Sequence, residues 1–244
     1  MNAIAERRLG PLTVRASTGE AMVGDVVAAV REHKAMRIAF ANTHLIYCAA
    51  RDPELARELE AFFVVNDGVG VDLLSRIATG EPFPENLNGT DLTPRILDAL
   101  PGGSRIFLLG ATTEVAVAAA GKIQQRWPSL VICGVRDGYA STVDAIEQIT
   151  RVAPDLVLVA MGNPLQERLI ADCSRQLDSV FIGVGALFDF IAGAAPRAPI
   201  AWRRLRVEWL FRLMREPSRL WRRYTIEVLV LTALICRERL ARRA

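Results

Sequence analysis

The second half of the chain alternates short, continuously apolar segments with amphipathic helical patterns, and this alternation restricts the fold more than any other feature. The apolar segments are residues 105–109, 130–135, 154–160 and 179–182. Helical patterns fill the intervals, at residues 112–127, 141–152 and 163–173. Strands that are apolar throughout are typical of a parallel sheet covered on both faces. The sequence therefore predicts an α/β fold with a Rossmann-like parallel sheet and helices on both faces.

The first half of the chain continues this alternation less regularly. Residues 3–15 predict a short hairpin, and Thr18 is a typical capping residue for the helix that follows. Residues 36–40 predict a strand, and residues 62–65 predict another that leads through a tight turn into a helix. Residues 79–88 contain two prolines and few apolar side chains, which indicates a surface loop beside a strand end.

Asp67 is the first candidate for a catalytic side chain. It follows the apolar residues 62–65 after Asn66, and it precedes Gly68. Ligands of open α/β sheets bind beyond the carboxyl ends of the strands, where this carboxylate is expected. Asp is also a common helix N-cap, so the local pattern supports a structural interpretation as well. Both interpretations stay open on this motif alone.

Polar or glycine-rich clusters follow six of the predicted strands. They are residues 42–44, 66–68, 110–112, 137–139, 161–167 and 183–185. In a parallel sheet they converge on one edge, where glycine-rich turns before helices bind phosphate through backbone N–H groups. Glycine in one turn is often only conformational, but six clusters together favour a nucleotide or nucleotide-sugar ligand. His44 belongs to the first cluster and either contacts that ligand or only helps to begin a helix.

Several catalytic and cofactor motifs are absent from the sequence. It contains no GxGxxG, no GxxxxGK[ST], no HExxH, no Asp-x-Asp pair and no GxSxG. The four cysteines include no CxxC pair, which is typical of reduced cysteines in a cytosolic compartment. Residues 1–15 lack the apolar segment of a secretory signal. We therefore predict a protein without a metal site and without a cofactor.

The C-terminal segment differs from the rest of the chain in charge. Residues 197–244 contain thirteen arginines and four glutamates, although the net charge of the whole chain is only +3. An arginine-rich segment on a mildly acidic body indicates an anionic partner, for which nucleic acid, anionic lipid and a phosphate-bearing substrate are the options. We accordingly divide the chain into an α/β core, residues 1–196, and an Arg-rich helical appendage, residues 197–244.

The appendage is predicted to form two helices, residues 199–214 and 218–240, with a break at Pro217. Residues 226–236 are almost wholly apolar, but these eleven residues span only about 16 Å, against about 30 Å for a hydrocarbon core. This length excludes a transmembrane span and favours a membrane-associating interfacial helix or a homo-oligomer contact. A nucleic-acid partner is not expected, because the aromatic residues recur at helical core spacing and the apolar block has no use on a DNA-binding face.

A set of short motifs also follows in a characteristic order along the chain. They are Asn66-Asp67-Gly68-Val69-Gly70, Gly89-Thr90-Asp91-Leu92, Phe107-Leu108-Leu109-Gly110-Ala111, Gly138-Tyr139, Met161-Gly162-Asn163-Pro164-Leu165-Gln166-Glu167, Gly183-Val184-Gly185-Ala186-Leu187-Phe188-Asp189, Arg197-Ala198-Pro199 and Glu208-Trp209-Leu210. In this order the motifs resemble the WecG/TagA/CpsF glycosyltransferases (glycosyltransferase family 26), roughly over residues 10–224.

The resemblance implies an inverting, metal-independent hexosyltransferase. Such an enzyme moves a sugar from a UDP-sugar donor, of the N-acetylmannosamine type, glucose or a related sugar, to a polyprenyl-diphosphate-linked acceptor such as undecaprenyl diphosphate. It acts as a peripheral protein at the cytoplasmic face of the inner (plasma) membrane, in cell-surface polysaccharide or exopolysaccharide biosynthesis. The alternative is a non-catalytic nucleotide-binding or nucleic-acid-binding protein.

The resemblance also implies roles for individual residues. The family's proposed general base falls on Asp67, its strand-end asparagine on Asn42 and its PxQE glutamine on Gln166. Its appendage arginines reach the active site, and the candidates here are Arg212, Arg215, Arg219, Arg222 and Arg223. The full set of expected substrate-binding residues is Asn42, Thr43, Asn66, Asn86, Thr90, Asp91, Gly110, Ala111, Gly138, Tyr139, Met161, Gly162, Pro164, Gln166, Glu167, Gly183, Gly185, Phe188, Arg212, Arg219 and Arg222.

Two positions depart from the family pattern. Family members often have a polar residue two positions before the asparagine, where this chain has Phe40. Many have an arginine in the loop before the GxDL motif, where this chain has Asn86. Either departure is expected to alter how the donor diphosphate or its sugar is held, so the donor sugar can differ from N-acetylmannosamine.

Overall fold

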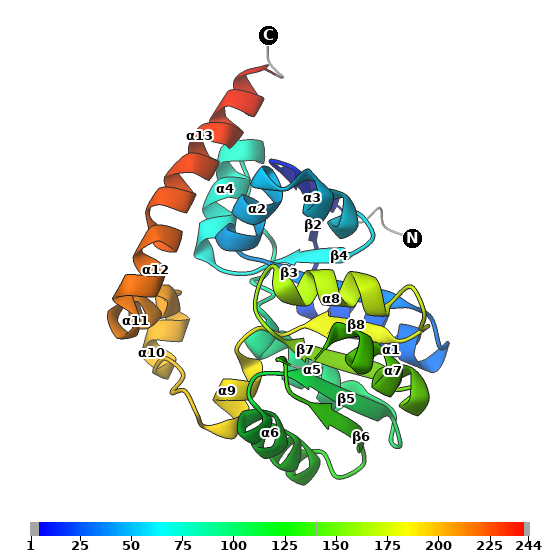
Figure 1. Cartoon of the computed structure of the whole chain (residues 1–244). Helices are drawn as coiled ribbons and strands as arrows, with labels where there is room; N and C mark the ends of the chain where they lie inside the picture. The colour runs from blue at the N-terminus through cyan, green and yellow to red at the C-terminus, as the bar shows by residue number, and fades with distance from the viewer. Residues whose placement is uncertain (1–4, 140, 242–244) are drawn as a thin grey trace.

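The computed structural model describes residues 5–139 and 141–241, which form one sheet with helices on both faces (Figure 1). The strands are β1 (Ala5–Leu9), β2 (Leu12–Ala16), β3 (Met36–Ala41), β4 (Phe63–Asn66), β5 (Arg105–Gly110), β6 (Val131–Arg136), β7 (Leu156–Ala160) and β8 (Val180–Gly183). They lie in the order β1-β2-β4-β3-β8-β7-β5-β6. Only β1 and β2 pair antiparallel, and the other neighbours pair parallel. The predicted parallel sheet and hairpin are therefore confirmed.

The helices of the core cover the two faces of the sheet in separate hydrophobic clusters. They are α1 (Gly19–Arg31), α2 (Thr43–Arg51), α3 (Pro53–Leu59), α4 (Val69–Thr79), α5 (Gly89–Ala99), α6 (Thr113–Arg126), α7 (Thr142–Val152), α8 (Leu165–Cys173) and α9 (Leu187–Ala192). Side chains of α2, α3, α4, α7 and α8 pack on one face, and those of α1, α5, α6 and α9 pack on the other. Successive residues of a strand alternate between the clusters, as Val157 and Leu158 of β7 do, because strand side chains point to opposite faces.

Residues 197–241 of the C-terminal segment contain four helices where the sequence predicts two. They are α10 (Ile200–Arg204), α11 (Glu208–Arg215), α12 (Pro217–Tyr224) and α13 (Ile226–Ala241). Arg206 separates α10 from α11, because its φ of 60° is incompatible with a continuous helix. Thr225 separates α12 from α13, and its hydroxyl donates to the carbonyl of Trp221 at 2.7 Å, a bond that bends helices. Neither break is marked by proline or glycine, so the sequence pattern does not reveal it. The sequence pattern also did not predict the short helix α9.

The last helix, α13, packs onto the core beside α4 and α2 (Figure 1). Its Leu231 and Ile235 are buried in the same hydrophobic cluster as the residues of α2 and α4. On its outer side, Leu229 and Val230 are exposed. The apolar block that the sequence shows is thus divided between a core-facing and a solvent-facing side. Among the described residues, no helix is long and apolar enough to cross a bilayer.

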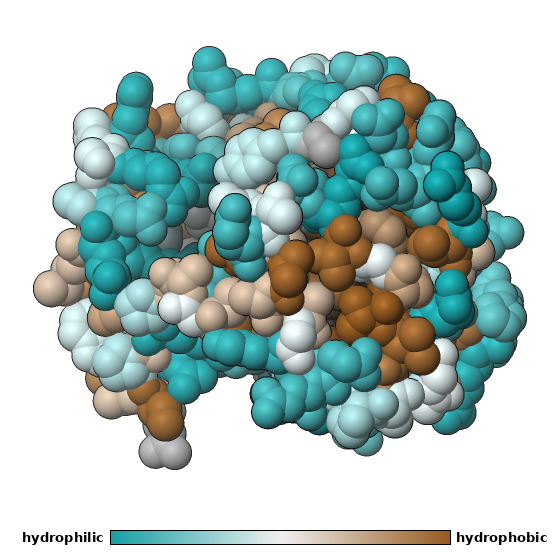
Figure 2. All heavy atoms as spheres, turned by 60° about the horizontal axis from the view of Figure 1, so that its bottom comes forward, coloured by the Kyte–Doolittle hydropathy of each residue, from teal (hydrophilic) through white to brown (hydrophobic). Residues whose placement is uncertain are grey.

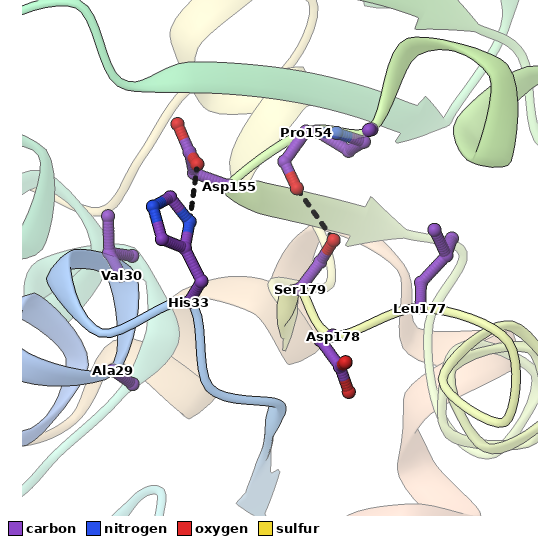
Figure 3. A pocket seen from close by; sticks show the side chains of 9 residues that line it. Ala29, Val30, His33, Pro154, Asp155, Leu177, Asp178 and Ser179 are labelled. Atoms are coloured by element: carbon purple, nitrogen blue, oxygen red, sulfur yellow. Dashed lines mark hydrogen bonds and ion pairs between the residues drawn. The ribbon is translucent and has the colours of Figure 1, made fainter.

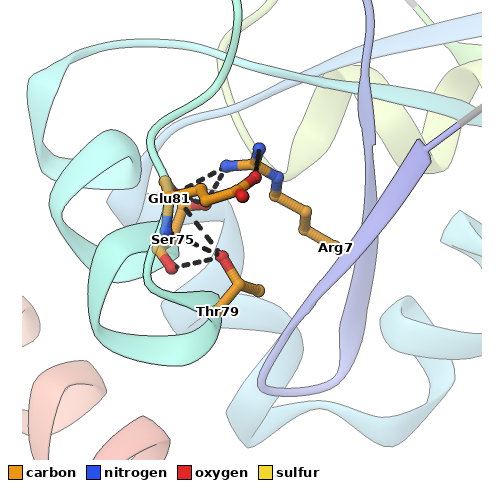
Figure 4. Close-up of polar contacts among 4 residues, drawn as sticks. All are labelled: Arg7, Ser75, Thr79 and Glu81. Atoms are coloured by element: carbon orange, nitrogen blue, oxygen red, sulfur yellow. Dashed lines mark hydrogen bonds and ion pairs between the residues drawn. The ribbon is translucent and has the colours of Figure 1, made fainter.

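The N-terminal hairpin holds the start of the loop at residues 80–88. Arg7 of β1 donates hydrogen bonds to the hydroxyl of Ser75 at 2.7 Å and to the carbonyl of Glu81 at 2.6 Å. Figure 4 shows these groups gathered with Thr79 at the end of α4. The Arg7 guanidinium also lies 4.9 Å from the ring centre of Phe83. These contacts fix the loop that approaches the end of β4.

The free edge of the sheet at β6 is only partly covered. The residues of β6 are exposed or half-buried, whereas those of β7 are buried throughout. Figure 2 turns the bottom of Figure 1, where α6 and β6 lie, towards the reader and shows apolar side chains gathered among hydrophilic ones. Homo-oligomer formation stays a prediction.

Candidate active site

The carboxyl ends of the parallel strands meet at one edge of the sheet, which we call the carboxyl edge. Residues 42–44 follow β3, and residues 66–68 and 110–112 begin with the last residues of β4 and β5. Residues 137–139 and 161–167 follow β6 and β7, and residues 183–185 begin with the last residue of β8. These strands pair parallel with their neighbours. The polar clusters of the sequence therefore lie at the same edge, as the parallel pairing requires.

Asp67 lies at the carboxyl edge, directly after β4. The N-cap of α4 is Gly68, which makes no side-chain capping bond, so Asp67 does not cap this helix. The backbone N–H of Asp67 donates to the carbonyl of Ala41 at 2.8 Å, which ties the turn to the end of β3. The structural interpretation of this aspartate as a cap is thus ruled out, and its carboxylate is free for another role.

The surroundings of Asp67 favour its protonated form more than water does. Burial raises the pKa of Asp67 to about 6, and the positive charge of Arg212 partly opposes this rise. The negative charges of Glu208 and Asp91 add to it. A carboxylate with a pKa near neutrality accepts a proton more readily than an ordinary aspartate, which suits a general base.

Arg212 and Tyr224 bring the appendage to the same carboxylate. The Arg212 guanidinium lies 5.3 Å from the ring centre of Phe190 and hydrogen-bonds to Tyr224. Burial raises the pKa of Tyr224, and the charge of Asp67 contributes in the same direction. The ring of Tyr224 packs edge-on against Trp209, with 5.6 Å between ring centres. Residues from α11 and α12 therefore face the end of β4.

Two ion pairs hold the appendage against α4 and α5. Arg197 contacts Asp91 at 2.6 Å and Glu208 at 3.8 Å. Burial opposes the ionisation of Asp91, but hydrogen bonds from Asn88 and Arg197 outweigh it and keep the pKa of Asp91 below its usual value. Asp91, an expected ligand residue, is thus engaged by the appendage.

The second ion pair joins Arg206 to Asp72 of α4, at 2.8 Å. The side chain of Asp72 is almost fully buried, and its burial raises its pKa, while the charge of Arg206 opposes this rise. A buried carboxylate needs such a partner, and the residue that supplies it is the one that separates α10 from α11. The sequence offers no signal for it.

A buried network of side-chain amides joins the ends of β3, β7 and β8. Glu167 accepts hydrogen bonds from the amide of Asn163 at 2.6 Å and from that of Gln166 at 2.8 Å. The side-chain amide of Asn42 donates to the Oδ1 of Asn163 at 2.8 Å. The side-chain oxygen of Gln166, Oε1, accepts hydrogen bonds from the backbone N–H groups of Gly162 and Gly185. Two of the N–H groups expected to bind phosphate are therefore occupied by Gln166.

Glu167 is the charged member of this amide network. Its side chain is buried, and its second oxygen, Oε2, has no hydrogen-bond partner among the described residues. Burial raises the pKa of Glu167 to about 7. Gln166 and Glu167 are exposed by only 2% and 1%, so they form part of the framework of the carboxyl edge, and their contact with a ligand stays a prediction.

Close packing at this edge requires glycine at two of the expected site positions. A Cβ on Gly110 would lie 2.3 Å from the carbonyl oxygen of Ala160, and its φ is 128°. A Cβ on Gly183 would lie 2.7 Å from the amide nitrogen of Gln166. Gly110 permits close approach of the ends of β5 and β7, and Gly183 permits close approach of α8 to the end of β8, so packing alone accounts for a glycine at each position.

The remaining expected residues are distributed between the core, the edge and the surface. Asn66 and Phe188 are completely buried, and Thr43 is buried against Gly70. Tyr139, Arg219 and Arg222 are exposed, and Arg219 pairs with Glu216 beside it on the helix. The other expected residues lie at the carboxyl edge, partly exposed or in its turns: Thr90, Ala111, Gly138, Met161 and Pro164.

The two positions that depart from the family pattern have clear structural surroundings. Phe40 is buried, and its ring lies so close to Gly89 that a Cβ added to this glycine would be 2.8 Å from the ring. It therefore packs on the start of α5 instead of facing a ligand. Asn86 accepts a hydrogen bond from the backbone N–H of Gly68 at 2.7 Å. The effect of Phe40 and of Asn86 on the donor stays a prediction.

His44 is engaged in a largely buried hydrogen bond. Its Nδ1 lies 2.9 Å from a carboxylate oxygen of Glu227 in α13, and its Nε2 lies 3.7 Å from the sulfur of Cys48. Of the two interpretations that the sequence left open, the structural one accounts for both ring nitrogens. This pair joins the start of α2 to the C-terminal helix.

Two surface pockets lie apart from Asp67. The first is at the amino-terminal end of β7 and β8, where His33 and Asp155 form an ion pair at 3.6 Å (Figure 3). The second lies between α6 and the end of β6. Neither pocket is lined by an expected site residue. Within residues 5–139 and 141–241, no three His, Cys, Asp or Glu side chains are grouped to hold a metal ion.

Sequence reasoning missed several residues that build this site. Asn163 completes the amide network, Arg197 pairs with Asp91 of α5 and with Glu208, and Tyr224 interacts with Arg212 and Asp67. Asn163, Arg197 and Glu208 stand inside the recognised motifs, which was the only signal for them. Tyr224 had none beyond its place in the Arg-rich segment.

Comparison with known proteins gives concordant results. A family model described as "Glycosyl transferase WecG/TagA/CpsF family" matches residues 7–244. Proteins of Bacillus subtilis and Bacillus spizizenii, both named N-acetylglucosaminyldiphosphoundecaprenol N-acetyl-beta-D-mannosaminyltransferase, are 34% and 32% identical to the chain. These alignments cover 81% and 85% of the chain and 78% and 82% of the relatives. A Staphylococcus aureus protein of the same name is 34% identical over 78% of the chain and 72% of its own length.

Proposed function

Because the chain belongs to the WecG/TagA/CpsF family of glycosyltransferases, we propose that it transfers a sugar from a UDP-sugar to a polyprenyl-diphosphate-linked acceptor with inversion at the anomeric carbon. The names of its relatives support an acceptor of the N-acetylglucosaminyl-diphospho-undecaprenol type and a donor of the N-acetylmannosamine type. Glucose or a related sugar is the second candidate donor, because Asn86 lies where many family members have an arginine.

The observation that carries this proposal is Asp67, a carboxylate at the carboxyl edge whose pKa is raised to about 6. In the proposed step, the acceptor hydroxyl oxygen forms a bond to the anomeric carbon while the bond from that carbon to the UDP oxygen breaks. The hydroxyl proton passes to Asp67, and UDP leaves with the electron pair of the broken bond. Attack opposite to the leaving group inverts the anomeric centre.

The leaving diphosphate needs positive charge, which we assign to the appendage and not to a resident metal. The charge of Arg212 lowers the pKa of both Asp67 and Tyr224, and the charge of Arg223 lowers that of Tyr224. Both guanidinium groups are therefore our candidates for contacts with the diphosphate. Charge-assisted hydrogen bonds from arginine to phosphate are stronger than neutral ones. Arg219 and Arg222 are exposed and are better placed for an anionic surface.

We further propose that α12 and α13 hold the protein at the cytoplasmic face of the plasma membrane, as a peripheral protein. The exposed Leu229 and Val230 would enter the interface, while Arg219 and Arg222 would contact anionic headgroups. This location brings the carboxyl edge to a lipid-linked acceptor. A role in cell-surface polysaccharide or exopolysaccharide synthesis follows from such an acceptor.

The decisive experiment measures UDP release from UDP-N-acetylmannosamine and UDP-glucose, with and without a polyprenyl-diphosphate-linked N-acetylglucosamine acceptor. We expect release that depends on the acceptor, a β-linked product from an α-linked donor, and equal rates in EDTA and in Mg²⁺. UDP binding without release from either donor would instead support a non-catalytic nucleotide-binding protein. Loss of activity in EDTA would contradict the metal-independent mechanism.

The pH dependence of the reaction tests the surroundings of Asp67. In wild type, kcat/KM should rise with pH through an acid limb near pH 6, because Asp67 must be ionised to accept a proton. Arg212→Gln removes a positive charge that lowers this pKa, so the limb should move to higher pH. Glu208→Gln removes a negative charge that raises it, so the limb should move to lower pH. Shifts in the same direction would contradict this arrangement.

A further inference from the structure

Asn86 contacts the turn that carries Asp67. Its Oδ1 accepts the backbone N–H of Gly68 at 2.7 Å, and Gly68 directly follows Asp67 in the chain. We propose that Asn86 is a positioning residue for the transfer reaction, which holds the Asp67 carboxylate in its productive orientation. This inference rests on the proposed function, because it gives Asn86 a role only through Asp67.

Hydrogen bonds fix the peptide groups on both sides of Asp67. The N–H before its Cα donates to the carbonyl of Ala41 at 2.8 Å, and the N–H after it, on Gly68, donates to Asn86. Gly68 has a φ of 92°, in a region that residues with side chains rarely adopt. Because glycine can adopt many other conformations, the turn depends on its hydrogen bonds to keep this one. Because peptide groups are planar, fixing both of them restricts the direction of the Asp67 side chain.

The loop that carries Asn86 is held independently of the Asn86 side chain. The amide of Asn66 donates to the carbonyl of Glu85 at 2.9 Å, and the N–H of Leu87 donates to the carbonyl of Asn66 at 3.1 Å. The carboxylate of Glu85 contacts Arg95 at 2.7 Å, and the side chain of Leu87 is buried. A substitution at residue 86 therefore removes one bond to the Asp67 turn and leaves the loop attached.

The required property of residue 86 is a hydrogen-bond acceptor. Asparagine and aspartate both offer a carbonyl or carboxylate oxygen at this distance, whereas leucine has a similar size and offers none. Asp adds a negative charge near Asp67, which disfavours the ionisation of Asp67. The pair of variants Asn86→Leu and Asn86→Asp thus separates the loss of the acceptor from a change of charge.

Kinetics of these two variants test the proposal. Asn86→Leu should lower kcat by on the order of 10- to 100-fold, because small misplacements of a reacting group are costly. The affinity for UDP should be kept, and the Tm should fall by only about 2–4 °C, the effect of one lost hydrogen bond. Asn86→Asp should recover most of kcat at pH 9 and show an acid limb at higher pH than wild type. Full kcat in Asn86→Leu, or equal losses in both variants at pH 9, would overturn the positioning role.

A double-mutant cycle separates this role from the proposed function. In an Asp67→Asn background, Asn86→Leu should have no further effect, because a residue that acts through Asp67 has nothing left to position. An equal loss in both backgrounds would overturn the role of Asn86 and leave the base intact. Undiminished turnover of Asp67→Asn alone would overturn the proposed base and, with it, the premise of this inference.

Discussion

Replacing Asp67 with asparagine should lower kcat by about 10²- to 10⁴-fold, which is the usual contribution of a general base. The amide has nearly the same shape as the carboxylate but cannot accept the proton of the acceptor hydroxyl. The affinity for UDP should be kept, because the proposed diphosphate contacts come from Arg212 and Arg223. Turnover is measured as acceptor-dependent UDP release, and UDP affinity by calorimetry.

The thermal stability of Asp67→Asn distinguishes a loss of the general base from a loss of folded protein. The pKa of Asp67 is raised on folding, so the native state binds more protons than the unfolded state between about pH 4 and pH 6. Wild-type stability therefore falls as pH rises through this window, and Asp67→Asn should remove this contribution. At pH 8 the variant should unfold at the same or a higher temperature than wild type.

A matched control for this result is Asp172→Asn on α8. Asp172 is half-exposed and lies 3.7 Å from Arg175, three residues away on the surface, so the variant should keep full turnover and Tm. Undiminished turnover of Asp67→Asn, or an equal loss in both variants, would remove Asp67 from the mechanism.

Leu231→Ala should reduce the free energy of unfolding by about 2–5 kcal/mol, the usual cost of removing a buried leucine side chain. Leu231 is completely buried in the cluster that also contains residues of α2 and α4. The substitution would leave a cavity between α13 and the core, since close-packed surroundings relax only partly. The change is measured by urea denaturation, or as a shift of about 2–4 °C in Tm per kcal/mol.

The matched control is Leu229→Ala on the same helix. Leu229 is 69% exposed, so this variant should change stability by no more than about 0.5 kcal/mol. It should instead reduce sedimentation with vesicles that contain anionic lipid, because it removes apolar surface from the proposed interfacial side. Equal stability of both variants would show that α13 is not packed on the core, and unchanged sedimentation of Leu229→Ala would contradict the membrane role.

The elements of the core were predictable because their signals are local. Continuous apolar strands such as residues 156–160 and capped helices such as α1 are specified within a few residues, and parallel pairing then brings the strand ends together. The position of Asp67 followed from the same reasoning. The breaks at Arg206 and Thr225 did not, because each depends on a backbone conformation that an uninterrupted helical pattern conceals.

The sequence by itself determined the sheet, the convergence of its polar strand ends and Asp67 as the candidate base, since hydrophobic periodicity and ordered motifs are properties of the chain. Only the tertiary structure decided which side chains surround that base. It engaged Gln166 and Glu167 in a buried network, placed Arg212 and Tyr224 near Asp67, and turned Asn86 towards Gly68. These contacts join residues far apart in sequence, and their strength depends on burial, which no local pattern encodes.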